Sequence, residues 1–214
     1  MYNINYFKEK DKQSIMDFIE DYPFAFMTGS FLSGMQVATQ IPILSEQRNG
    51  ELYFQGHIMR NTDHHKAFAE NPEALLVFSG PNCYVSASWY SNPATASTWN
   101  YMSVHVSGQV NFMSDNKFIE FMRKLTLKFE NYDTLSPTIY DNLSDQYLSR
   151  MLPAIVGFEI KAEQFENVFK LSQNMDKNSY ISIISKLLER GGFSALIANE
   201  MLKRKNEIFP ESET

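Results

Sequence analysis

A short segment from Gly56 to Lys66 groups side chains that bind anions. It contains one Arg, one Lys, three His and a Thr hydroxyl within eleven residues. The segment follows a predicted strand and leads into a predicted short helix, where helix-start N–H groups are free. Cationic groups supply charge to an anion, and hydroxyl and N–H groups can meet its remaining oxygens. The pattern suggests an anion site, although an ordinary structural role explains these residues equally well.

The chain shows no pattern of a catalytic or metal centre. Its four histidines form neither an HExxH motif nor a compact set with acidic residues. The single cysteine, Cys83, excludes an intrachain disulfide and a thiolate metal cluster. Phosphate-binding glycine motifs and the GxSxG nucleophile motif are also missing from the sequence. We therefore predict no metal site and name no catalytic residue.

Aromatic residues concentrate between residues 80 and 108, a stretch that holds both tryptophans and three tyrosines. The residues alternate in character over 83–88 and 104–110, which predicts two strands joined by the polar loop 91–97. Large aromatics beside such a loop either belong to the core or wall a flat, ring-shaped ligand. Both interpretations stay open at this point.

A strand predicted over residues 35–44 has an unusual polar interruption. Thr39 and Gln40 break its apolar alternation. The strand backbone and these two polar side chains could meet the edge of a flat heterocycle. A structural role accounts for the same pattern equally well.

Short strands dominate the first half of the chain. Beside the two strands of the aromatic region, we expect four others, at residues 24–28, 37–45, 52–58 and 75–78. Asn49-Gly50 has the sequence of a tight hairpin turn, and Gly80-Pro81 predicts another turn. Six strands within the first 112 residues favour a closed antiparallel barrel or a sandwich.

Helical patterns lie between and after these strands. Asp11 can cap a short helix that ends near Ile19, and Asp115 can cap a helix that reaches Leu125. Gly191-Gly192 separates two predicted tail helices, which would pack on the barrel or on a partner subunit. The remaining expected elements are short helices at 63–69 and 147–152 and a strand at 154–160.

Length predicts one domain over residues 1–214, with a barrel and inserted helices at 1–170 and a helical appendage at 171–214. The composition is 43% hydrophobic with 17 Phe and 11 Met, which suits a large core or interface. Two basic runs, 117–128 and 203–205, lie in helical patterns and indicate solvated faces.

The formal net charge of −6 argues mildly against a general nucleic-acid binder. No apolar run approaches the roughly 18 residues that a membrane span needs. The first residues lack a secretory signal, so we expect a cytoplasmic protein that has no membrane partner.

Several of these motifs together resemble a known family. In chain order they are Tyr2-Asn3-Ile4-Asn5-Tyr6-Phe7, Gly80-Pro81, Tyr84-Val85-Ser86, Ser88-Trp89-Tyr90, Thr98-Trp99-Asn100-Tyr101, Val104-His105-Val106, Gly108, Ile155-Val156-Gly157-Phe158 and Lys170-Leu171-Ser172-Gln173-Asn174. The combination is similar to the PaiB-type FMN-binding negative transcriptional regulators, relatives of the pyridoxamine-phosphate-oxidase split-barrel flavoproteins. The likeness extends over nearly the whole chain, to about Leu202.

The resemblance implies an α+β fold, mainly β, with a six-stranded antiparallel FMN-binding split barrel and flanking and C-terminal helices. It implies a homodimer that holds FMN between the subunits. The FMN phosphate is expected in the loop after His57, the isoalloxazine along residues 37–41, and a wall at residues 98–101. The implied cofactor-binding residues are Val37, Ala38, Thr39, Gln40, His57, Arg60, Thr62, His64, Lys66, Trp99, Asn100 and Gln173.

The sequence departs from the family pattern in the phosphate loop. The family commonly has Asn-Pro followed by an aromatic-basic pair, whereas this chain has Thr62-Asp63 and His65-Lys66. Gln40 also stands where the family often has His. The Asp63 carboxylate would repel a phosphate dianion, so we expect weakened FMN affinity.

Three functions fit this sequence. The first is a homodimeric FMN-binding regulator, a role that the resemblance alone implies. The second is an FMN-dependent oxidoreductase acting on a small molecule, since flavin carries its own redox chemistry and needs no recognisable catalytic pair. The third is a binding module that holds another ligand or none. DNA is a partner by resemblance only, because neither a helix-turn-helix signature nor the charge supports direct contact.

Overall fold

The computed structural model of the protein describes residues 1–210, and these contain eight strands and six α-helices. The strands are β1 (Phe24–Ser30), β2 (Gln36–Pro42), β3 (Leu44–Arg48), β4 (Glu51–Met59), β5 (Glu73–Val85), β6 (Thr98–Phe112), β7 (Ile155–Lys161) and β8 (Gln164–Lys170). The α-helices are α1 (Lys12–Asp21), α2 (Asp63–Glu70), α3 (Asp115–Phe129), α4 (Asp145–Met151), α5 (Lys177–Arg190) and α6 (Gly192–Ile208).

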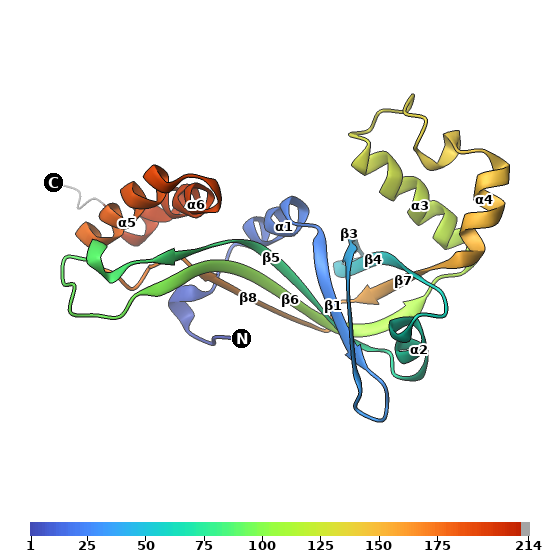
Figure 1. Ribbon diagram of the computed structural model, residues 1–214, viewed down its shortest axis with the longest axis horizontal. Coiled ribbons are helices and arrows are strands. Elements are labelled where there is room, and N and C mark those ends of the chain that lie inside the picture. The colour runs from blue at the N-terminus through green and yellow to red at the C-terminus, as the bar shows by residue number, and fades with distance from the viewer. Residues whose placement is uncertain (211–214) are drawn as a thin grey trace. The chain divides into compact units, whose positions relative to one another are not determined.

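The strands form one antiparallel sheet in the order β2-β1-β5-β6-β7-β4-β3, with β8 paired to β6 (Figure 1). The α+β class is therefore confirmed. The expected number of six strands is not confirmed, because the sheet has eight within the described residues. The sheet is also not closed there, since β2 and β3 at its two ends do not pair with each other. One added strand is β7, predicted but left out of the count of six. The other is β8, where buried residues cluster at one end instead of alternating.

Two errors within the first 112 residues cancel in the strand count. The predicted strand 37–45 is divided into β2 and β3, whereas the strands predicted on both sides of Gly80-Pro81 are one continuous strand, β5. The buried side of β5 changes there, from Phe78 to Pro81 and Cys83. This local irregularity accommodates the Gly-Pro pair without a chain reversal.

Local sequence signals fixed several element ends as expected. The Asp11 carboxylate accepts the N–H of Ser14 at 2.9 Å, at the start of α1. The turn between β3 and β4 uses Asn49 and Gly50 at φ of 52° and 81°, the left-handed geometry of a tight hairpin turn. The cap of α3 differs from the prediction, because Ser114 takes the N-cap position and Asp115 begins the helix.

The chain divides into two compact units. Unit 2 comprises Ile19–Phe78 and His105–Phe165. In its core, buried side chains of α3 pack with Leu44 of β3, and Phe118 and Phe121 stack with 6.3 Å between ring centroids. These helix residues follow the 3.6-residue spacing recognised in the sequence.

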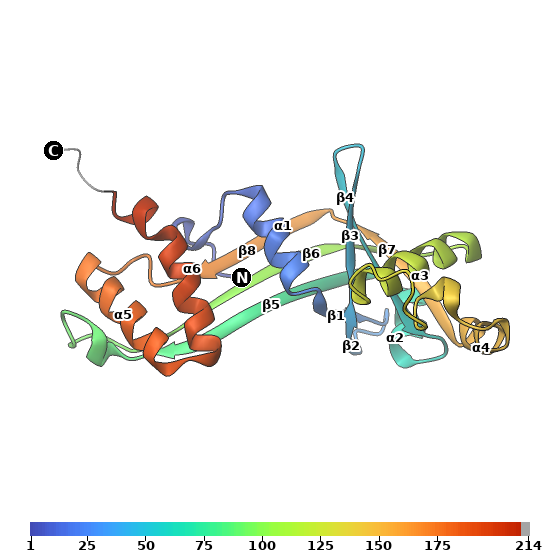
Figure 2. The same cartoon turned by 90° about the horizontal axis from the view of Figure 1, so that it is seen from above.

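Unit 1 comprises Met1–Phe18, Ser79–Val104 and the chain from Glu166 onward. Its helices α5 and α6 lie on one face of its strands (Figure 1 and Figure 2). Tyr180 of α5 is fully buried and donates its hydroxyl to the carbonyl of Met201 in α6 at 2.9 Å. The division predicted between residues 170 and 171 stays a prediction. The last residues of the predicted helical appendage, 211–214, lie outside the described part of the chain.

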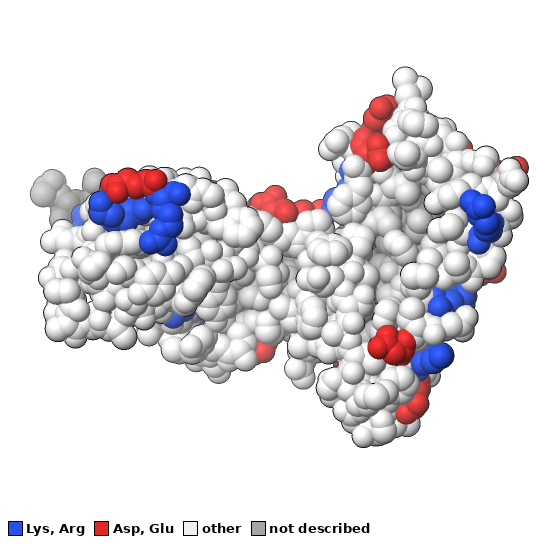
Figure 3. Space-filling view, viewed as in Figure 1, with Lys and Arg blue, Asp and Glu red and all other residues white. Residues whose placement is uncertain are grey.

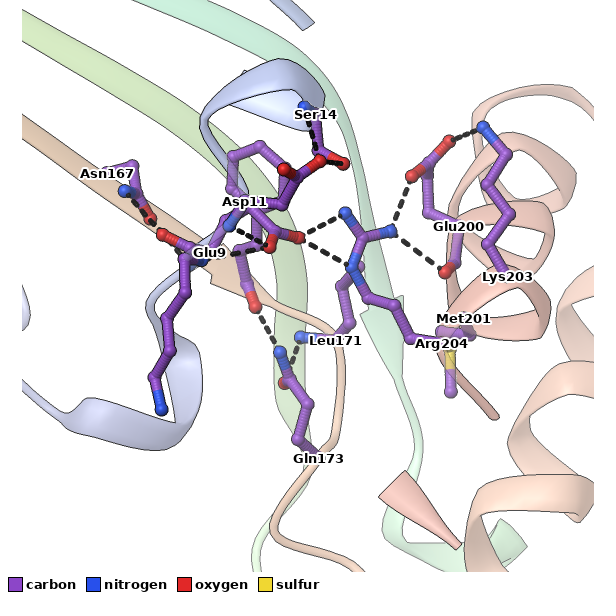
Figure 4. A network of polar contacts seen from close by, with 12 residues as sticks. Glu9, Asp11, Ser14, Asn167, Leu171, Gln173, Glu200, Met201, Lys203 and Arg204 are labelled. Atoms are coloured by element: carbon purple, nitrogen blue, oxygen red, sulfur yellow. Dashed lines mark hydrogen bonds and ion pairs between the residues drawn. The ribbon is translucent and has the colours of Figure 1, made fainter. Parts of the chain in front are cut away.

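Unit 1 is also held together by a polar network around Arg204 (Figure 4). The Arg204 guanidinium lies 2.7 Å from the Glu9 carboxylate and 2.6 Å from that of Glu200. The Asn167 side chain binds both backbone groups of Glu9, accepting its N–H at 2.8 Å and donating to its carbonyl at 3.1 Å. This network joins the N-terminal segment to β8 and α6. Figure 3 shows acidic and basic side chains next to each other over the C-terminal helices.

None of the helices within residues 1–210 is both long enough and apolar enough to cross a membrane.

Candidate functional site

The candidate site in unit 2 is built where α2 packs on the β1–β2 hairpin. Gly29 of β1 permits this approach, because a Cβ there would lie only 2.4 Å from the Phe68 ring of α2. Glu70 at the end of α2 accepts the N–H of Leu32 in the hairpin loop at 2.8 Å. Close packing and a hydrogen bond therefore both hold the helix against the hairpin.

The strand β2 carries four of the predicted cofactor residues. Val37 is buried, whereas Ala38 and Gln40 are exposed and Thr39 is half-buried. In the described sheet β2 is an edge strand, so backbone N–H and C=O groups on its outer side are not used by a neighbouring strand. Such an edge can hydrogen-bond a planar heterocycle, as the sequence suggested for this strand.

The turn between β4 and α2 is fixed by its own backbone contacts. Asn61 has a φ of 65°, and the Thr62 hydroxyl donates to the carbonyl of Met59 at 2.8 Å. Thr62 is the N-cap of α2 and accepts the N–H of His65. Arg60 is tied to the β7 end through its Nε, which donates to the carbonyl of Ile155 at 3.0 Å. The predicted phosphate residues therefore occupy one ordered turn.

Positive charge converges on His65 in this turn. Partial burial lowers the pKa of the His65 imidazole, and the charges of Arg60, His64 and Lys66 lower it further. Three of the predicted phosphate residues are thus close enough to act on one ring. Arg60 and Lys66 take part in no ion pair within residues 1–210, which leaves their charge available to a ligand.

Asp63 occupies the first position of α2 and competes with an anion. Its carboxylate accepts the N–H of His64 at 2.7 Å and lies 3.0 Å from the His64 Nδ1. The His64 backbone N–H is the main reason that the pKa of Asp63 lies below its usual range. Asp63 and Thr62 therefore occupy two helix-start amides that were expected to be free for a phosphate.

His57, predicted as a cofactor-binding residue, has a different environment from the predicted phosphate residues. Its ring lies 6.2 Å from the Phe121 ring of α3, and its Nδ1 is buried with no hydrogen-bond partner within residues 1–210. Burial lowers the pKa of His57, so the imidazole is neutral near pH 7. This placement gives a phosphate no positive charge, and the predicted cofactor role of His57 stays a prediction.

Three predicted cofactor residues belong to unit 1. Trp99 is exposed, with its ring 6.2 Å from that of Tyr84 on the neighbouring strand. Asn100 is fully buried and exchanges hydrogen bonds with the Ser172 hydroxyl at 2.9 and 3.1 Å. Gln173 uses both ends of its amide, accepting the N–H of Leu171 in its own loop and donating to the carbonyl of Phe169 in β8. Their roles in cofactor binding remain untested.

Sequence reasoning missed His65 as the centre of this turn. The His65 Nδ1 accepts the N–H of Asn61 at 3.2 Å, which closes the turn across four residues. The available signal was Asn61, a residue type that tolerates the left-handed region and is frequent in turns. As for metals, no group of three or more His, Cys, Asp or Glu within residues 1–210 could hold an ion.

Residues 1–164 match a family model described as "Putative FMN-binding domain". The chain belongs to this family. It is 30% identical to the "Protease synthase and sporulation protein PAI 2" of Bacillus subtilis, over 96% of this chain and 98% of that one. The resemblance to PaiB-type proteins is therefore confirmed.

Solved structures share the fold at low sequence identity. The "FAD and Heme binding protein" of Mycobacterium smegmatis aligns with a TM-score of 0.56 and 16% identity, over 77% of this chain and 73% of that one. The "Flavocytochrome Anf3" of Azotobacter vinelandii aligns with a TM-score of 0.55 and 16% identity, over 79% of this chain and 72% of that one. These similarities concern the fold alone.

Proposed function

We propose that this protein binds FMN in unit 2, with the phosphate held by Arg60 and Lys66 beside the start of α2. The observation that carries this proposal is that Arg60 and Lys66, which both act on the His65 ring, have no acidic partner within residues 1–210 and belong to a segment whose helix packs on the edge strand β2. The family description names FMN, and the names of two structural neighbours include a flavin.

The residues present fit a phosphate through side chains more than through backbone. Two helix-start N–H groups are already hydrogen-bonded, so Arg60 and Lys66 must supply most of the charge-assisted bonds. The outer edge of β2 supplies backbone donors and acceptors for the rim of the ring system. When bound, FMN supplies redox chemistry of its own.

A flavin titration tests the phosphate placement. Arg60→Ala and Lys66→Ala should each weaken FMN binding by about 1.5–3 kcal/mol, because each removes a hydrogen bond to a charged group. Lys117→Ala is the matched control, since Lys117 is exposed in unit 2 and makes no ion pair within residues 1–210. Calorimetry in which the Arg60→Ala/Lys66→Ala double variant binds FMN as tightly as the parent would contradict the placement.

We further propose that the protein is a homodimer. Unit 2 leaves large apolar side chains exposed on the β1–β2 hairpin, namely Phe24, Phe26, Leu32 and Met35, and Met59 is exposed at the end of β4. Covering such a group in a second copy would remove it from water. Light scattering should give the mass of a dimer, and Phe24→Glu with Phe26→Glu should shift it toward a monomer. Leu135→Glu, at an exposed loop position, should leave the mass unchanged, and a monomeric parent would contradict this proposal.

The role that we favour is that of a PaiB-like regulator in the cytoplasm. An oxidoreductase is the alternative, and the flavin-binding names of the structural neighbours favour it. Reduction of bound FMN by NADH or NADPH separates the two. A regulator should show reduction no faster than that of free FMN, whereas rapid, saturable bleaching of the flavin band would identify an enzyme. Direct DNA contact should be weak, given the net charge of −6.

A further inference from the structure

A pocket of about 310 Å³ opens in unit 2 between the end of α1, the strands β3 and β4 and the last turns of α3. Its volume lies at the lower end of the range for small-molecule sites, about 300–1,000 Å³. None of the residues that line it belongs to the residues proposed to hold FMN. The pocket is therefore a separate place on unit 2 where a small ligand can bind.

Two ion pairs line this pocket and balance its charge. The Lys124 ammonium lies 3.1 Å from the Glu46 carboxylate, and Lys128 pairs with Glu20. The two lysines are four residues apart on α3, a spacing that places them on the same side of the helix. Positive groups from α3 thus face negative groups from α1 and β3, which suits a ligand that carries both charges.

The ammonium groups keep donors for a ligand. An ammonium has several N–H donors, and within residues 1–210 Lys124 and Lys128 each use one of them. Because both side chains line the pocket, their remaining N–H groups can bind the oxygens of a carboxylate.

The opposite side of the pocket keeps acceptors. Glu20 accepts hydrogen bonds from Lys128 and from the Ser45 hydroxyl, and a carboxylate has room for further donors. The Gln55 amide donates to Glu46 at 3.4 Å, while its carbonyl oxygen accepts from no donor within residues 1–210. These oxygens can bind an ammonium group.

The pocket also has an apolar wall. Leu127 lines it from α3, and the Tyr132 side chain, 69% exposed, lines it just beyond the helix end. Tyr132 has a φ of 61°, which bulky residues rarely adopt, and its N–H donates to the carbonyl of Leu127 at 2.8 Å. This turn holds an accessible aromatic ring beside the two ion pairs, where it can contact an apolar group of a ligand.

We propose that this pocket binds a zwitterionic α-amino acid with an apolar side chain. The ligand carboxylate binds Lys124 and Lys128, its ammonium binds Glu20 and Glu46, and its side chain contacts Tyr132. Ion pairs that are partly exposed contribute little to stability, so they can share their charges with a ligand at small cost. A ligand with a single charge would be repelled by one of the two pairs of like groups.

Calorimetric titration of the full chain with L-phenylalanine tests this proposal. At about pH 6, where an α-amino group is protonated, we expect saturable binding. N-acetyl-L-phenylalanine lacks the positive charge and L-phenylalaninamide lacks the negative one, so each should bind about tenfold more weakly. Either analogue binding as tightly as L-phenylalanine would overturn the proposal, and so would a lack of saturable binding of L-phenylalanine.

A matched pair of variants places the ligand in this pocket. Lys124→Gln removes a charge from a side chain that is 58% exposed, so the variant should fold as the parent does. It should weaken L-phenylalanine about tenfold and change L-phenylalaninamide about twofold or less, because only the former has a carboxylate to bind. Lys117→Gln changes an exposed lysine of the same helix outside the pocket and should alter neither. Tight binding of L-phenylalanine by Lys124→Gln, or an equal loss in Lys117→Gln, would overturn the proposal.

Discussion

Two groups of basic residues in this protein use the same side chains in opposite ways. Around Arg204 in unit 1, positive charge is balanced: Glu9 and Glu200 both bind the guanidinium, whose side chain is only 14% exposed. In the α2 turn of unit 2, Arg60 and Lys66 are exposed and have no acidic partner within residues 1–210. The comparison shows that a basic side chain paired with carboxylates serves the structure, whereas one without a carboxylate partner is available to a ligand.

The difference also explains why the two groups respond to different experiments. A cation that is desolvated with its partners contributes to folding, since loss of one member leaves an unpaired buried charge. A solvated cation contributes little to folding but can contribute strongly to the binding of an anion. Stability measurements should therefore report on unit 1 and flavin titrations on unit 2.

The largest effect is expected from Arg204→Met. This change leaves Glu9 and Glu200 without their shared partner, and the free energy of unfolding should fall by about 3 kcal/mol. Urea denaturation measures the loss. Lys205→Ala, one residue along the same helix, is the control and should change stability by about 0.5 kcal/mol or less. An Arg204→Met protein as stable as the parent would contradict the claim that the ion pairs of Arg204 contribute to folding.

A smaller effect should come from the pH dependence of His57→Gln. His57 has a lowered pKa in the folded protein, so the unfolded chain binds more protons between that pKa and the ordinary value of 6.5. Its contribution to stability is present above pH 6.5 and is lost as the pH falls toward the folded pKa. Thermal melts between about pH 7 and pH 5 should show a shallower decline in the variant, by up to about 1 kcal/mol.

Unit 1 supplies the reference for that experiment. Burial alone would raise the pKa of Glu200, but hydrogen bonds from Lys203 and Arg204 hold it below its ordinary value of 4.5. Its stabilisation is therefore present above pH 4.5 and lost only at lower pH. Glu200→Gln should leave the slope between about pH 7 and pH 5 unchanged. A change of that slope in Glu200→Gln and not in His57→Gln would contradict the assignment.

The smallest effect is expected from Asp63→Asn. The substitution removes a carboxylate beside the proposed phosphate site and keeps a side-chain oxygen that can accept the His64 N–H. The charge is exposed and screened, so FMN binding should tighten only roughly twofold. A matched change at Asp115, the exposed first residue of α3, should have no effect on FMN. Weaker binding in Asp63→Asn would place the phosphate elsewhere.

Local signals predicted much of the fold. Period-2 alternation over 104–110 located part of β6, and 3.6-residue spacing located α3, because both patterns reflect burial on one side of an element. The failures have a physical cause. β8 has three exposed residues followed by three buried ones, a pattern set by its neighbours and not by alternation. Pro81 indicated a turn, yet the sheet kept the strand continuous there.

The sequence indicated which residues gather in the candidate site, but it did not indicate which side chains pair with one another over long distances in the chain. The residues of the α2 turn are adjacent in sequence, so their convergence followed from local reasoning. The run 203–205 was interpreted as a solvated face, whereas Arg204 binds Glu9 across 195 positions. Residue spacing carries no information about such a pair, because only the completed fold brings the two together.

The Glu9 contacts also set an order of events during synthesis. Asn167 and Arg204, which hold Glu9 in place, follow it by 158 and 195 residues. Glu9 can therefore make these contacts only after Arg204 has left the ribosome. Unit 2 has all of its residues once Phe165 is made. The contacts of Glu9 with Arg204 thus form only after every residue of unit 2 has been made.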